Sequence, residues 1–384
     1  MNSETQARTE ADFIIVGAGI AGASVGYWLA PFGRVVILER ETQPGYHATG
    51  RSAAIFVLGY GNAQVRAITR ASLSFMQSPP AGFAEHPLLS PRGVLVVASE
   101  DQLPQLEAFW HEIRETSPSA RRLSAAEACA MVPALRPSKV AAAVYEADAF
   151  DIDVHALHQG FLKGVRHAGG QIVCDAEVST IEPNGGAWTV TAGTRQWRAP
   201  VLIDAAGAWA DIVAELAGVA PLGLVPKRRS ACILPAPADM TIAHWPMVLG
   251  ATEDWYIKPD AGALLASPAN ADPVPPQDVQ PEDLDIALAM YRVEEMTTLD
   301  ASRPKTPWAG LRTFSPDGGL VGGFDDEVPG FFWLAAQGGY GIQTSPAMGE
   351  ACAALVRNLP LPTHISAQGL ETAMLGAARL RRTK

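Results

Sequence analysis

A short apolar run that leads into a glycine-rich turn constrains this chain more than any other feature. Residues Phe13–Val16 read FIIV, which is typical of a buried parallel strand. The residues that follow, Gly17-Ala18-Gly19-Ile20-Ala21-Gly22, fit the pattern G-x-G-x-x-G. In such a turn Gly17 permits a tight bend, Gly19 lets the backbone approach a pyrophosphate, and Gly22 lets a helix pack closely on the strand.

An acid at the end of the second apolar run completes this unit. A helical pattern ends near Gly33, and the run Val35–Leu38 then leads to Glu39. Glu39 can accept hydrogen bonds from a ribose, and it lies 17 residues beyond Gly22, close to the usual spacing of about 20. Strand, glycines, helix, strand and acid in this order predict a βαβ unit that binds a dinucleotide on the helix N-terminus. The motif alone does not separate a flavin from a nicotinamide nucleotide.

The bulk composition limits the class of protein. The chain has 384 residues, of which 48% are hydrophobic, enough for a large core divided between two domains. The net charge of −11 argues against a nucleic-acid partner. There is no run of 18 apolar residues, so we expect no transmembrane segment. The widely spaced cysteines, at positions 129, 174, 232 and 352, indicate a reducing compartment, so we expect a cytoplasmic protein.

Both ends of the chain are polar. Residues 1–11 contain no signal-peptide core, and we expect them to be a disordered tail. The basic end, Arg379–Lys384, is expected to be a solvated tail, with a weak electrostatic contact to a membrane surface as the alternative.

The C-terminal part has the same order of patterns as the N-terminal motif. An apolar run, Phe331–Ala336, meets a glycine-rich turn, Gln337–Thr344, and then a helical pattern from Ser345 to Asn358. We therefore expect the two ends to build one Rossmann-like α/β domain, with an α+β domain on a mainly antiparallel sheet inserted between them. The predicted cofactor domain comprises residues 12–85, 145–225 and 305–384, and the predicted substrate domain comprises residues 86–144 and 226–304.

Three sequence motifs can now be considered as a set: the glycine motif with Glu39, the strand-end turn Ile203–Trp209, and the turn Gln337–Thr344. This set resembles the D-amino-acid oxidase / glycine oxidase family of FAD enzymes over nearly the whole chain. Within that family the resemblance is closest to the bacterial FAD-dependent D-arginine dehydrogenases. The segments that carry it are GAGIAGASVGYWLA, QPGYHATGRSAA, EHPLLSPR, LGLVPKRRSA, YIKPDAG, SPANADPV, WAGLRTF and AAQGGYGIQTS.

The resemblance implies a non-covalent FAD. Glu39 would hold the adenosine ribose, the Val178 backbone would contact the adenine, and the loop Thr49–Ala53 would line the pyrophosphate and the flavin edge. The turn Gly339–Gln343 precedes a helix, whose positive N-terminal end would stabilise an anionic reduced flavin; the alternative for its glycines is C-caps and hairpin turns. The expected cofactor residues are Gly17, Gly19, Ile20, Ala21, Gly22, Glu39, Arg40, Thr49, Arg51, Ser52, Ala53, Val178, Ala206, Gly207, Gly310, Gly338, Gly339, Tyr340, Gly341, Ile342 and Gln343.

A carboxylate substrate needs a bidentate partner, which arginine supplies. The resemblance places Arg312, Arg229, Tyr256 and Tyr60 around the carboxylate of an amino acid, with Gly339 and Gln343 nearby. A surface salt bridge is the alternative for each arginine, and the sequence does not separate Arg229 from its neighbour Arg228.

We name no general base, because a neutral amine can give up hydride to a flavin if it is well oriented. We also expect no metal site. His155 and His158 lie three residues apart on a predicted helix without a suitable partner, and we interpret them and His47 as helix-surface and loop-packing residues.

Departures from the D-arginine dehydrogenases bear on the substrate side chain. The relatives hold a distal cation with an acid after HPLLSPR, where this chain has Gly93-Val94-Leu95, and they carry polar groups where this chain has Ile55-Phe56-Val57-Leu58. Val94, Ile55 and Val57 therefore favour a neutral or hydrophobic side chain over D-Arg or D-Lys. Glu85 and Glu253 or Asp254 are the acids that could restore a cation site, and Glu85 is the first of them to consider.

The function expected from the resemblance is oxidative deamination of a D-amino acid by hydride transfer from Cα to flavin N5. The product imino acid would hydrolyse to a 2-oxo acid and ammonia. One alternative is oxidation of a secondary amine such as glycine, sarcosine or an opine-like N-substituted amino acid. Another is a non-catalytic flavin-binding subunit of a larger complex. The electron acceptor, oxygen or a quinone, and the oligomeric state are not predicted.

Overall fold

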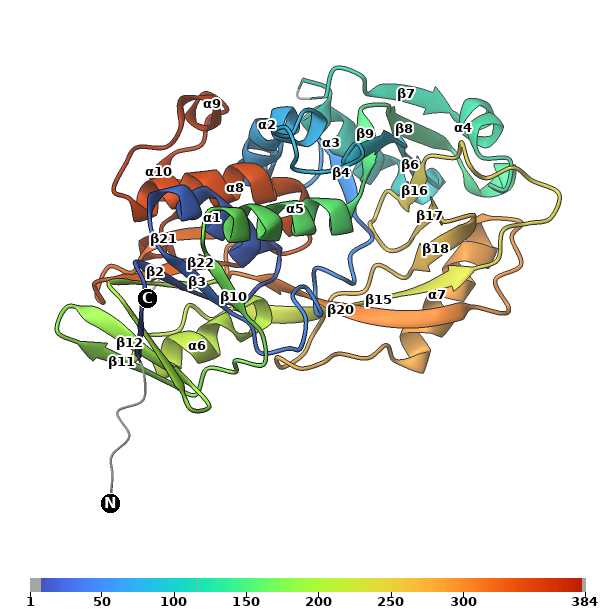
Figure 1. Cartoon of the computed structure of the whole chain (residues 1–384). Coiled ribbons are helices and arrows are strands. Elements are labelled where there is room, and N and C mark those ends of the chain that lie inside the picture. The colour runs from blue at the N-terminus through green and yellow to red at the C-terminus, as the bar shows by residue number, and fades with distance from the viewer. Residues whose placement is uncertain (1–7, 116, 382–384) are drawn as a thin grey trace.

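The computed structural model describes residues 8–115 and 117–381, and a six-stranded sheet carries the opening motif (Figure 1). Its order is β10-β3-β2-β14-β22-β21, and all neighbouring strands are parallel except β21 and β22. The strands are β2 (Phe13–Val16), β3 (Val35–Leu38), β10 (Gln171–Val173), β14 (Val201–Asp204), β21 (Val321–Phe324) and β22 (Phe331–Ala335). The central strands come from both ends and the middle of the chain, and they are buried on both faces, as a covered parallel sheet requires.

Helices cover one face of this sheet, as Figure 1 shows for α1, α5 and α8. Glycines make the close approach of α1 possible, since a Cβ at Gly22 would lie 1.9 Å from the carbonyl oxygen of Gly17. The helices of this half are α1 (Ile20–Leu29), α2 (Ala63–Gln77), α5 (Val154–His167), α6 (Ala210–Leu216) and α8 (Gly341–Val356), with the short helices η1 (Ala30–Phe32) and η4 (Gly207–Trp209).

The opposite face packs against α6 and a four-stranded sheet of order β1-β13-β12-β11. Its strands are β1 (Arg8–Glu10), β11 (Thr180–Asn184), β12 (Ala187–Ala192) and β13 (Arg195–Ala199). The prediction of a disordered tail over residues 1–11 is wrong for its last part. β1 pairs in parallel with β13, and Ala11 N donates to Arg198 O at 2.8 Å. Residues 1–7 lie outside the described residues.

A nine-stranded, mainly antiparallel sheet forms the other half of the molecule. Its order is β19-β15-β18-β17-β16-β6-β8-β7, with β20 also paired to β15, and only β6 and β16 are parallel. The strands are β6 (Val94–Ala98), β7 (Arg121–Ser124), β8 (Ala142–Glu146), β15 (Val225–Leu234), β16 (Met247–Gly250), β17 (Tyr256–Asp260), β18 (Ala263–Ser267), β19 (Asp272–Pro273) and β20 (Lys305–Phe314). Its helices are α3 (Leu103–Ile113), α4 (Ala125–Met131), α7 (Asp283–Met296), η2 (Glu100–Gln102) and η3 (Pro137–Lys139).

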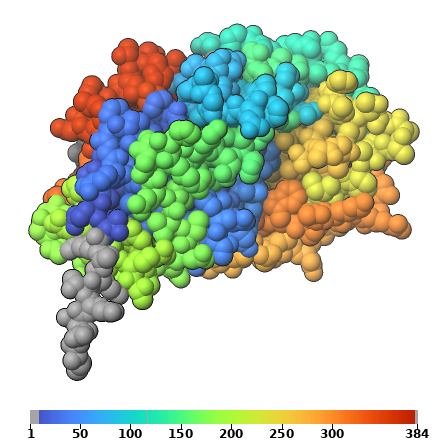
Figure 2. Space-filling model, in the orientation of Figure 1, coloured from blue at the N-terminus to red at the C-terminus, as the bar shows by residue number. Residues whose placement is uncertain are grey.

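The long strands β15 and β20 run from one half of the molecule toward the other (Figure 1). Because β20 pairs with β15, residues 305–314 belong to the nine-stranded sheet, although the sequence assigned them to the cofactor domain. A small sheet of order β4-β9-β5 also lies between the halves, with strands β4 (Ile55–Val57), β5 (Leu89–Pro91) and β9 (Ala149–Ile152). In Figure 2 blue, green and red segments share one side of the surface, while teal, yellow and orange segments form the other. The predicted fold class is therefore confirmed: a Rossmann-like domain built from distant segments, and a second domain on a mostly antiparallel sheet.

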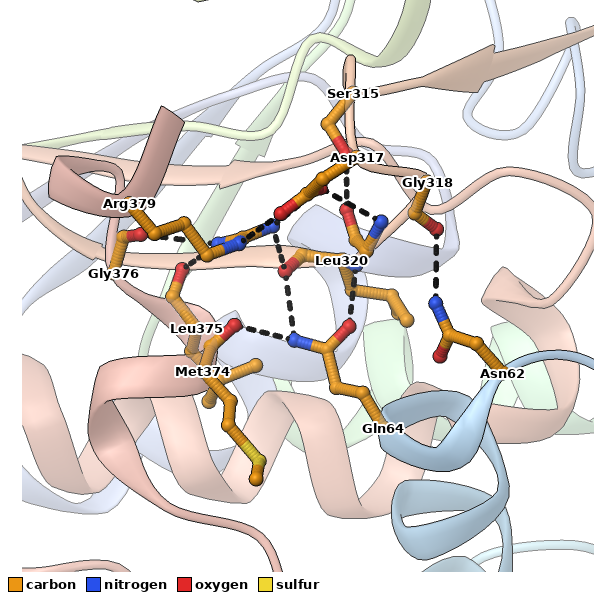
Figure 3. A network of polar contacts seen from close by, with 11 residues as sticks. Asn62, Gln64, Ser315, Asp317, Gly318, Leu320, Met374, Leu375, Gly376 and Arg379 are labelled. Carbon is orange, nitrogen blue, oxygen red and sulfur yellow. Dashed lines mark hydrogen bonds and ion pairs between the residues drawn. The ribbon is translucent and has the colours of Figure 1, made fainter. Parts of the chain in front are cut away.

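The C-terminal segment is fastened to the body of the protein (Figure 3). Its helices are α9 (Thr363–Ser366), α10 (Thr372–Leu375) and α11 (Ala378–Arg381). Arg379 pairs with Asp317 at 2.8 Å, and Arg381 pairs with the buried Asp325 at 2.6 Å. The expected solvated tail is therefore wrong for these two arginines, whose charges are neutralised, and residues 382–384 lie outside the described part. No helix among the described residues is long and apolar enough to cross a membrane.

Candidate functional site

A cavity lies at the carboxyl ends of β2, β3 and β14, where open parallel sheets bind ligands. It is lined by residues of the opening motif, of the loop after β3 and of the turn after β14. Those predicted from the sequence are Gly17, Gly19, Ile20, Ala21, Glu39, Arg40, Thr49, Val178, Ala206, Gly207 and Gly338.

The glycine turn is held by side chains from three other segments. Gly17 has φ +100°, and a Cβ there would lie 2.6 Å from Ala205 O, so only glycine fits. Ala18 N donates to Glu39 Oε2 at 2.9 Å, and Ile20 N donates to Thr49 Oγ1 at 3.0 Å. The turn and the acid predicted from sequence are thus physically joined.

Glu39 is shaped to accept further hydrogen bonds. It is buried, it lines the cavity, and its other oxygen accepts from Glu41 N at 3.0 Å. A carboxylate has about four lone-pair sites, so both oxygens keep acceptor capacity for hydroxyl donors. This is the chemistry that a ribose requires.

His158 lies beneath the turn rather than on a helix surface, which corrects the interpretation from sequence. Its Nε2 donates to Ala18 O at 2.8 Å, and burial lowers the pKa of the ring. Over residues 8–115 and 117–381 no cluster of three His, Cys, Asp or Glu side chains could hold a metal ion.

The outer end of the cavity has an aromatic and apolar wall, of whose residues only Arg40 was predicted to bind the cofactor. The Arg40 guanidinium lies 5.0 Å from the Trp209 ring centroid, and the His47 ring lies 4.7 Å from it on centroids. Ile212 and Leu216 also line the cavity. Flat and apolar surfaces of this kind suit a nucleotide base. The GAW letters after β14 were the available signal for Trp209.

A second cavity continues from the first, and a third follows. The second shares Ile20, Thr49 and Gly338 with the first, and Ser52, Gly339 and Arg312 with the third. Predicted residues that line the second include Arg51, Ser52, Ala53, Gly310, Gly339, Gly341 and Ile342. The three cavities therefore adjoin one another from the dinucleotide motif to the arginines, and we refer to them together as the channel.

The loop that flanks this channel is fixed to the nine-stranded half. Arg51 forms an ion pair with Asp278, and its Nη1 donates to Val279 O at 2.9 Å and to Ala309 O at 3.1 Å. Trp308 Nε1 donates to Arg51 O at 3.2 Å. The Arg51 side chain is thus occupied in holding the two halves together.

The helix after the C-terminal turn begins earlier than predicted. α8 starts at Gly341 rather than at Ser345, although Pro346 then falls inside it. Proline cannot bond to the Ile342 carbonyl, and Ser345 Oγ donates to that oxygen instead, at 3.0 Å. Because Gly341 and Ile342 line the channel, the positive helix end points to it.

The strand pair β15–β20 brings two arginines to one face. Lys227 is opposite Arg312 and Arg229 is opposite Gly310, so Arg229 and Arg312 are diagonal neighbours on the same side of the ribbon. Both line the second and third cavities. Arg228 points to the other face, where it pairs with Asp285 at 2.8 Å and with Glu282. Strand alternation thus separates the two neighbours that the sequence left open.

The two arginines are charged and have no acidic partner. Within the described residues neither forms an ion pair. Burial lowers the pKa of Arg229, and the charge of Arg312 lowers it further, while Tyr256 and Tyr60 oppose both. Burial also lowers the pKa of Arg312, but Tyr60 and Tyr256 outweigh it, so that this pKa is raised. A half-buried pair of cations without a counter-ion has the charge and the donors to attract an anion.

Gly339 lies directly against this pair. A Cβ at Gly339 would lie 2.8 Å from Arg312 Nη1, so a side chain there would displace the guanidinium. Gln343 lines the third cavity, but its amide is already bonded: Oε1 accepts from Val57 N at 3.1 Å and Nε2 donates to Thr69 Oγ1 at 3.0 Å.

Two predicted cofactor residues do not line the channel. Gly22 packs on the glycine turn. Tyr340 packs its ring 5.0 Å from that of Tyr60 and 6.4 Å from that of Phe314, and burial raises its pKa to about 12.

Beyond the arginines the third cavity has an apolar wall. Ile55, Val57 and Val94 line it as predicted, together with residues that the sequence analysis missed: Val96, Phe109, Met247, Leu249, Ala251 and Ala269. These come from α3, β6, β16 and two loops, so no local pattern connects them. Glu253 is the acid that lines the cavity; neither Glu85 nor Asp254, both in the described part, does so. This corrects the choice of Glu85 as the first acid to consider.

Comparison with known proteins supports an assignment to a family. The family model described as "DAO: FAD dependent oxidoreductase" matches residues 12–355. The uncharacterized oxidoreductase YurR of Bacillus subtilis (strain 168) is 26% identical over 370 residues, which cover 90% of this chain and 94% of that protein. Glycine oxidase from Geobacillus kaustophilus has a similar fold, with a TM-score of 0.80, 22% identity, and coverage of 91% of this chain and 95% of that one. L-Proline dehydrogenase from P. horikoshii gives a TM-score of 0.84 at 17% identity, covering 98% and 100%.

Proposed function

Because the chain belongs to the DAO family of FAD-dependent oxidoreductases, with FAD as its cofactor, we propose that it oxidises the amine of a D-amino acid with a neutral or hydrophobic side chain. The product imino acid then reacts with water to give a 2-oxo acid and ammonia. The observation that carries this proposal is the pair of unpaired cations, Arg229 and Arg312, at the inner end of the dinucleotide channel.

The residues of the channel fit FAD. Glu39, the glycine turn and the aromatic and apolar wall around Trp209 would hold the ADP portion. Ser52, Gly310 and the start of α8 would surround the flavin ring. The four free cysteines, at positions 129, 174, 232 and 352, line no part of the channel, which supports a non-covalent cofactor. When bound, FAD accepts the hydride that leaves the substrate Cα.

The arginines and tyrosines would hold the substrate. Arg312 and Arg229 offer forked donors to a carboxylate, and the hydroxyls of Tyr60 and Tyr256 line the same space. A substrate anchored by its carboxylate has its Cα and amine fixed relative to the channel, and this orientation replaces a general base. We accordingly assign no residue to proton abstraction.

The apolar wall would select the side chain. Val94, Ile55, Val57, Phe109 and Met247 give a distal charge no partner, whereas each buried apolar carbon gains free energy. The resemblance to D-arginine dehydrogenases thus supports the proposed binding of the substrate carboxylate. The apolar wall supports a substrate side chain other than that of arginine. Glu253, exposed at the cavity, is the group that could favour a cation instead.

A second candidate is oxidation of a secondary amine or of glycine. The similarity in fold to glycine oxidase and to L-proline dehydrogenase favours it, because the anionic carboxylate of either substrate would suit the same arginines. A non-catalytic flavin subunit is disfavoured by the unpaired arginines, which have no role in such a protein.

An anaerobic screen of flavin bleaching tests the proposed function and the second candidate. The purified, yellow holoprotein is mixed with each D- and L-amino acid, glycine, sarcosine and proline. Faster bleaching by neutral D-amino acids supports the proposal, and faster bleaching by secondary amines supports the second candidate. No bleaching by any of them removes both. Heat or acid should release free FAD; flavin that stays with the denatured chain contradicts non-covalent binding.

A further inference from the structure

A buried carboxylate outside the channel holds the turn that carries Tyr60. Glu146, the last residue of β8, is 2% exposed. Its Oε1 accepts hydrogen bonds from Leu58 N at 3.1 Å and from Gly59 N at 3.2 Å. These two residues lie between Val57 and Tyr60, both of which line the substrate cavity. The carboxylate thus accepts the hydrogen bonds that the carbonyl groups of a neighbouring strand would otherwise accept from these two N–H groups.

The sheet register explains why Glu146 lies there. Glu146 is the cross-strand partner of Val94, so both side chains leave the sheet on the same face. Val94 forms part of the cavity wall, and Glu146 lies beside it under the turn. A Cβ on Gly59 would lie 2.7 Å from Glu146 Oε2 and 2.9 Å from Ile113 Cγ2. The turn is therefore pressed onto the carboxylate.

The two ends of the turn are anchored separately. On one side Val57 N donates to Gln343 Oε1 at 3.1 Å. On the other side Asn62 caps α2 by accepting from Val65 N at 3.0 Å, and its amide donates to Gly318 O (Figure 3). Tyr60 lies between these anchors, directly after the two residues that Glu146 holds.

We propose that Glu146 is a positioning residue for substrate binding, which fixes the turn 57–61 so that Tyr60 faces Arg312. The inference rests on the proposed function, in which Tyr60 and Arg312 hold the substrate carboxylate. Without the carboxylate of Glu146 the N–H groups of Leu58 and Gly59 lose their acceptor, and the turn moves Tyr60 away from the cation pair.

The surroundings of Glu146 argue against a purely space-filling role. Its Oε2 is buried with no partner at ordinary hydrogen-bond distance among the described residues. Burial raises the pKa of this carboxyl, and the Ser117 hydroxyl, which is close enough to lower that pKa, only partly compensates for this. A buried polar atom left unpaired is unfavourable, and a Leu or Met of similar size would avoid that penalty. Only an acceptor, however, can bind the two N–H groups of the turn.

The test compares Glu146→Gln, Glu146→Asp, Tyr60→Phe and the double variant Tyr60→Phe/Glu146→Asp, with Asp148→Asn, an exposed acid nearby, as control. The substrate is the D-amino acid that bleaches the wild-type flavin fastest. Gln keeps an acceptor oxygen at the same reach, so Glu146→Gln should stay close to wild type. Asp is one methylene shorter, so Glu146→Asp should raise KM roughly tenfold, the equivalent of about one hydrogen bond, with a smaller change in kcat and unchanged FAD content.

Non-additivity separates positioning from general destabilisation. If Glu146 acts through Tyr60, the double variant should have the KM of its worse single variant. Additive effects, or an unchanged KM in Glu146→Asp, overturn the inference. If Glu146→Asp does not fold, Gly59→Ala pushes the turn off the carboxylate from the other side and should give the same rise in KM; an unchanged KM there is equally contrary. A wild type that oxidises no amino acid removes the proposed function itself.

Discussion

The two ends of the channel, one for the FAD nucleotide and one that we propose for the substrate and call the substrate end, differ in how they would recognise a ligand. The dinucleotide end is made largely of backbone: Gly17, Gly19 and the N-terminus of α1, supported by one acid, Glu39. The substrate end is made of side chains, with the cations Arg229 and Arg312 set against an apolar wall. Backbone recognition needs a few adjacent residues of fixed type, whereas side-chain recognition needs distant residues brought to one place.

This difference teaches how each end can be altered. The backbone end tolerates little change, because a single methyl group at Gly17 meets Ala205 O at 2.6 Å. The wall of the substrate end contains residues such as Val94, Phe109 and Met247 that can be exchanged for others of similar volume. Cofactor binding should therefore be lost by small changes, and substrate choice should be shifted by them.

The largest effect should come from the cation pair. Arg312→Ala should lower kcat/KM for every carboxylate substrate. The expected loss of transition-state stabilisation is about 2–5 kcal/mol, because the variant removes a half-buried charged partner of the substrate carboxylate. FAD content should not change. The measurement is steady-state kinetics with flavin absorbance, and Lys305→Ala, exposed on the same strand, is the control. Unchanged kinetics would remove Arg312 from the site.

Two glycines of the first turn should then behave differently. Gly17→Ala combines a positive φ with a contact of 2.6 Å, so both apoprotein stability and FAD affinity should fall, by roughly 2–3 kcal/mol. At Gly19 the nearest atom to a Cβ is Thr49 Oγ1 at 3.4 Å, so Gly19→Ala should leave the apoprotein melting temperature unchanged and weaken FAD alone. FAD titration and apoprotein melting check both; equal effects of the two variants would contradict backbone recognition at Gly19.

At the other end of the channel the wall should set the side-chain preference. Wild type should use D-Leu, D-Met or D-Phe better than D-Arg or D-Lys, and Val94→Glu should shift the ratio of kcat/KM values toward the cationic substrates by about tenfold. The shift should be moderate, because a new carboxylate at 94 lies opposite Glu146. Val94→Gln is the neutral control. If wild type already prefers D-Arg, Glu253→Gln should remove that preference.

The smallest effect concerns stability within the cofactor half. Asp204, at the end of β14, is fully buried, its Oδ2 has no partner among the described residues, and burial raises its pKa well above the ordinary value of 3.8. A raised pKa means that the folded state favours the neutral acid. The stability that Asp204 contributes is therefore fully present below pH 3.8, the ordinary pKa, and is lost as the pH rises toward the pKa of the folded state.

The neutral Asp204→Asn should therefore gain stability relative to wild type as the pH rises, by roughly 1 kcal/mol. Urea unfolding at pH 5 and at pH 8 measures this difference. A constant difference between the two pH values would mean that Asp204 is ionised in the folded protein at both pH values, so that its pKa is not raised into this range.

The sequence by itself determined the dinucleotide end and the general architecture. Gly17, Gly22 and Glu39 are informative because turn geometry and hydrogen-bond chemistry restrict their types, and they lie within one βαβ unit whose order along the chain is its order in space. The apolar runs of β2, β14 and β22 could be identified in the same way, since strands covered on both faces are apolar throughout.

The tertiary structure alone decided the substrate end. The alternation of β15 turned Arg229 to the cavity and Arg228 to Asp285, and the register of β20 placed Arg312 beside Arg229. The wall joins Phe109, Met247 and Leu249 from separate elements, and Glu146 reaches a turn that precedes it by more than 80 residues. Such contacts depend on strand pairing and packing between distant segments, for which no short stretch of sequence carries a local signal.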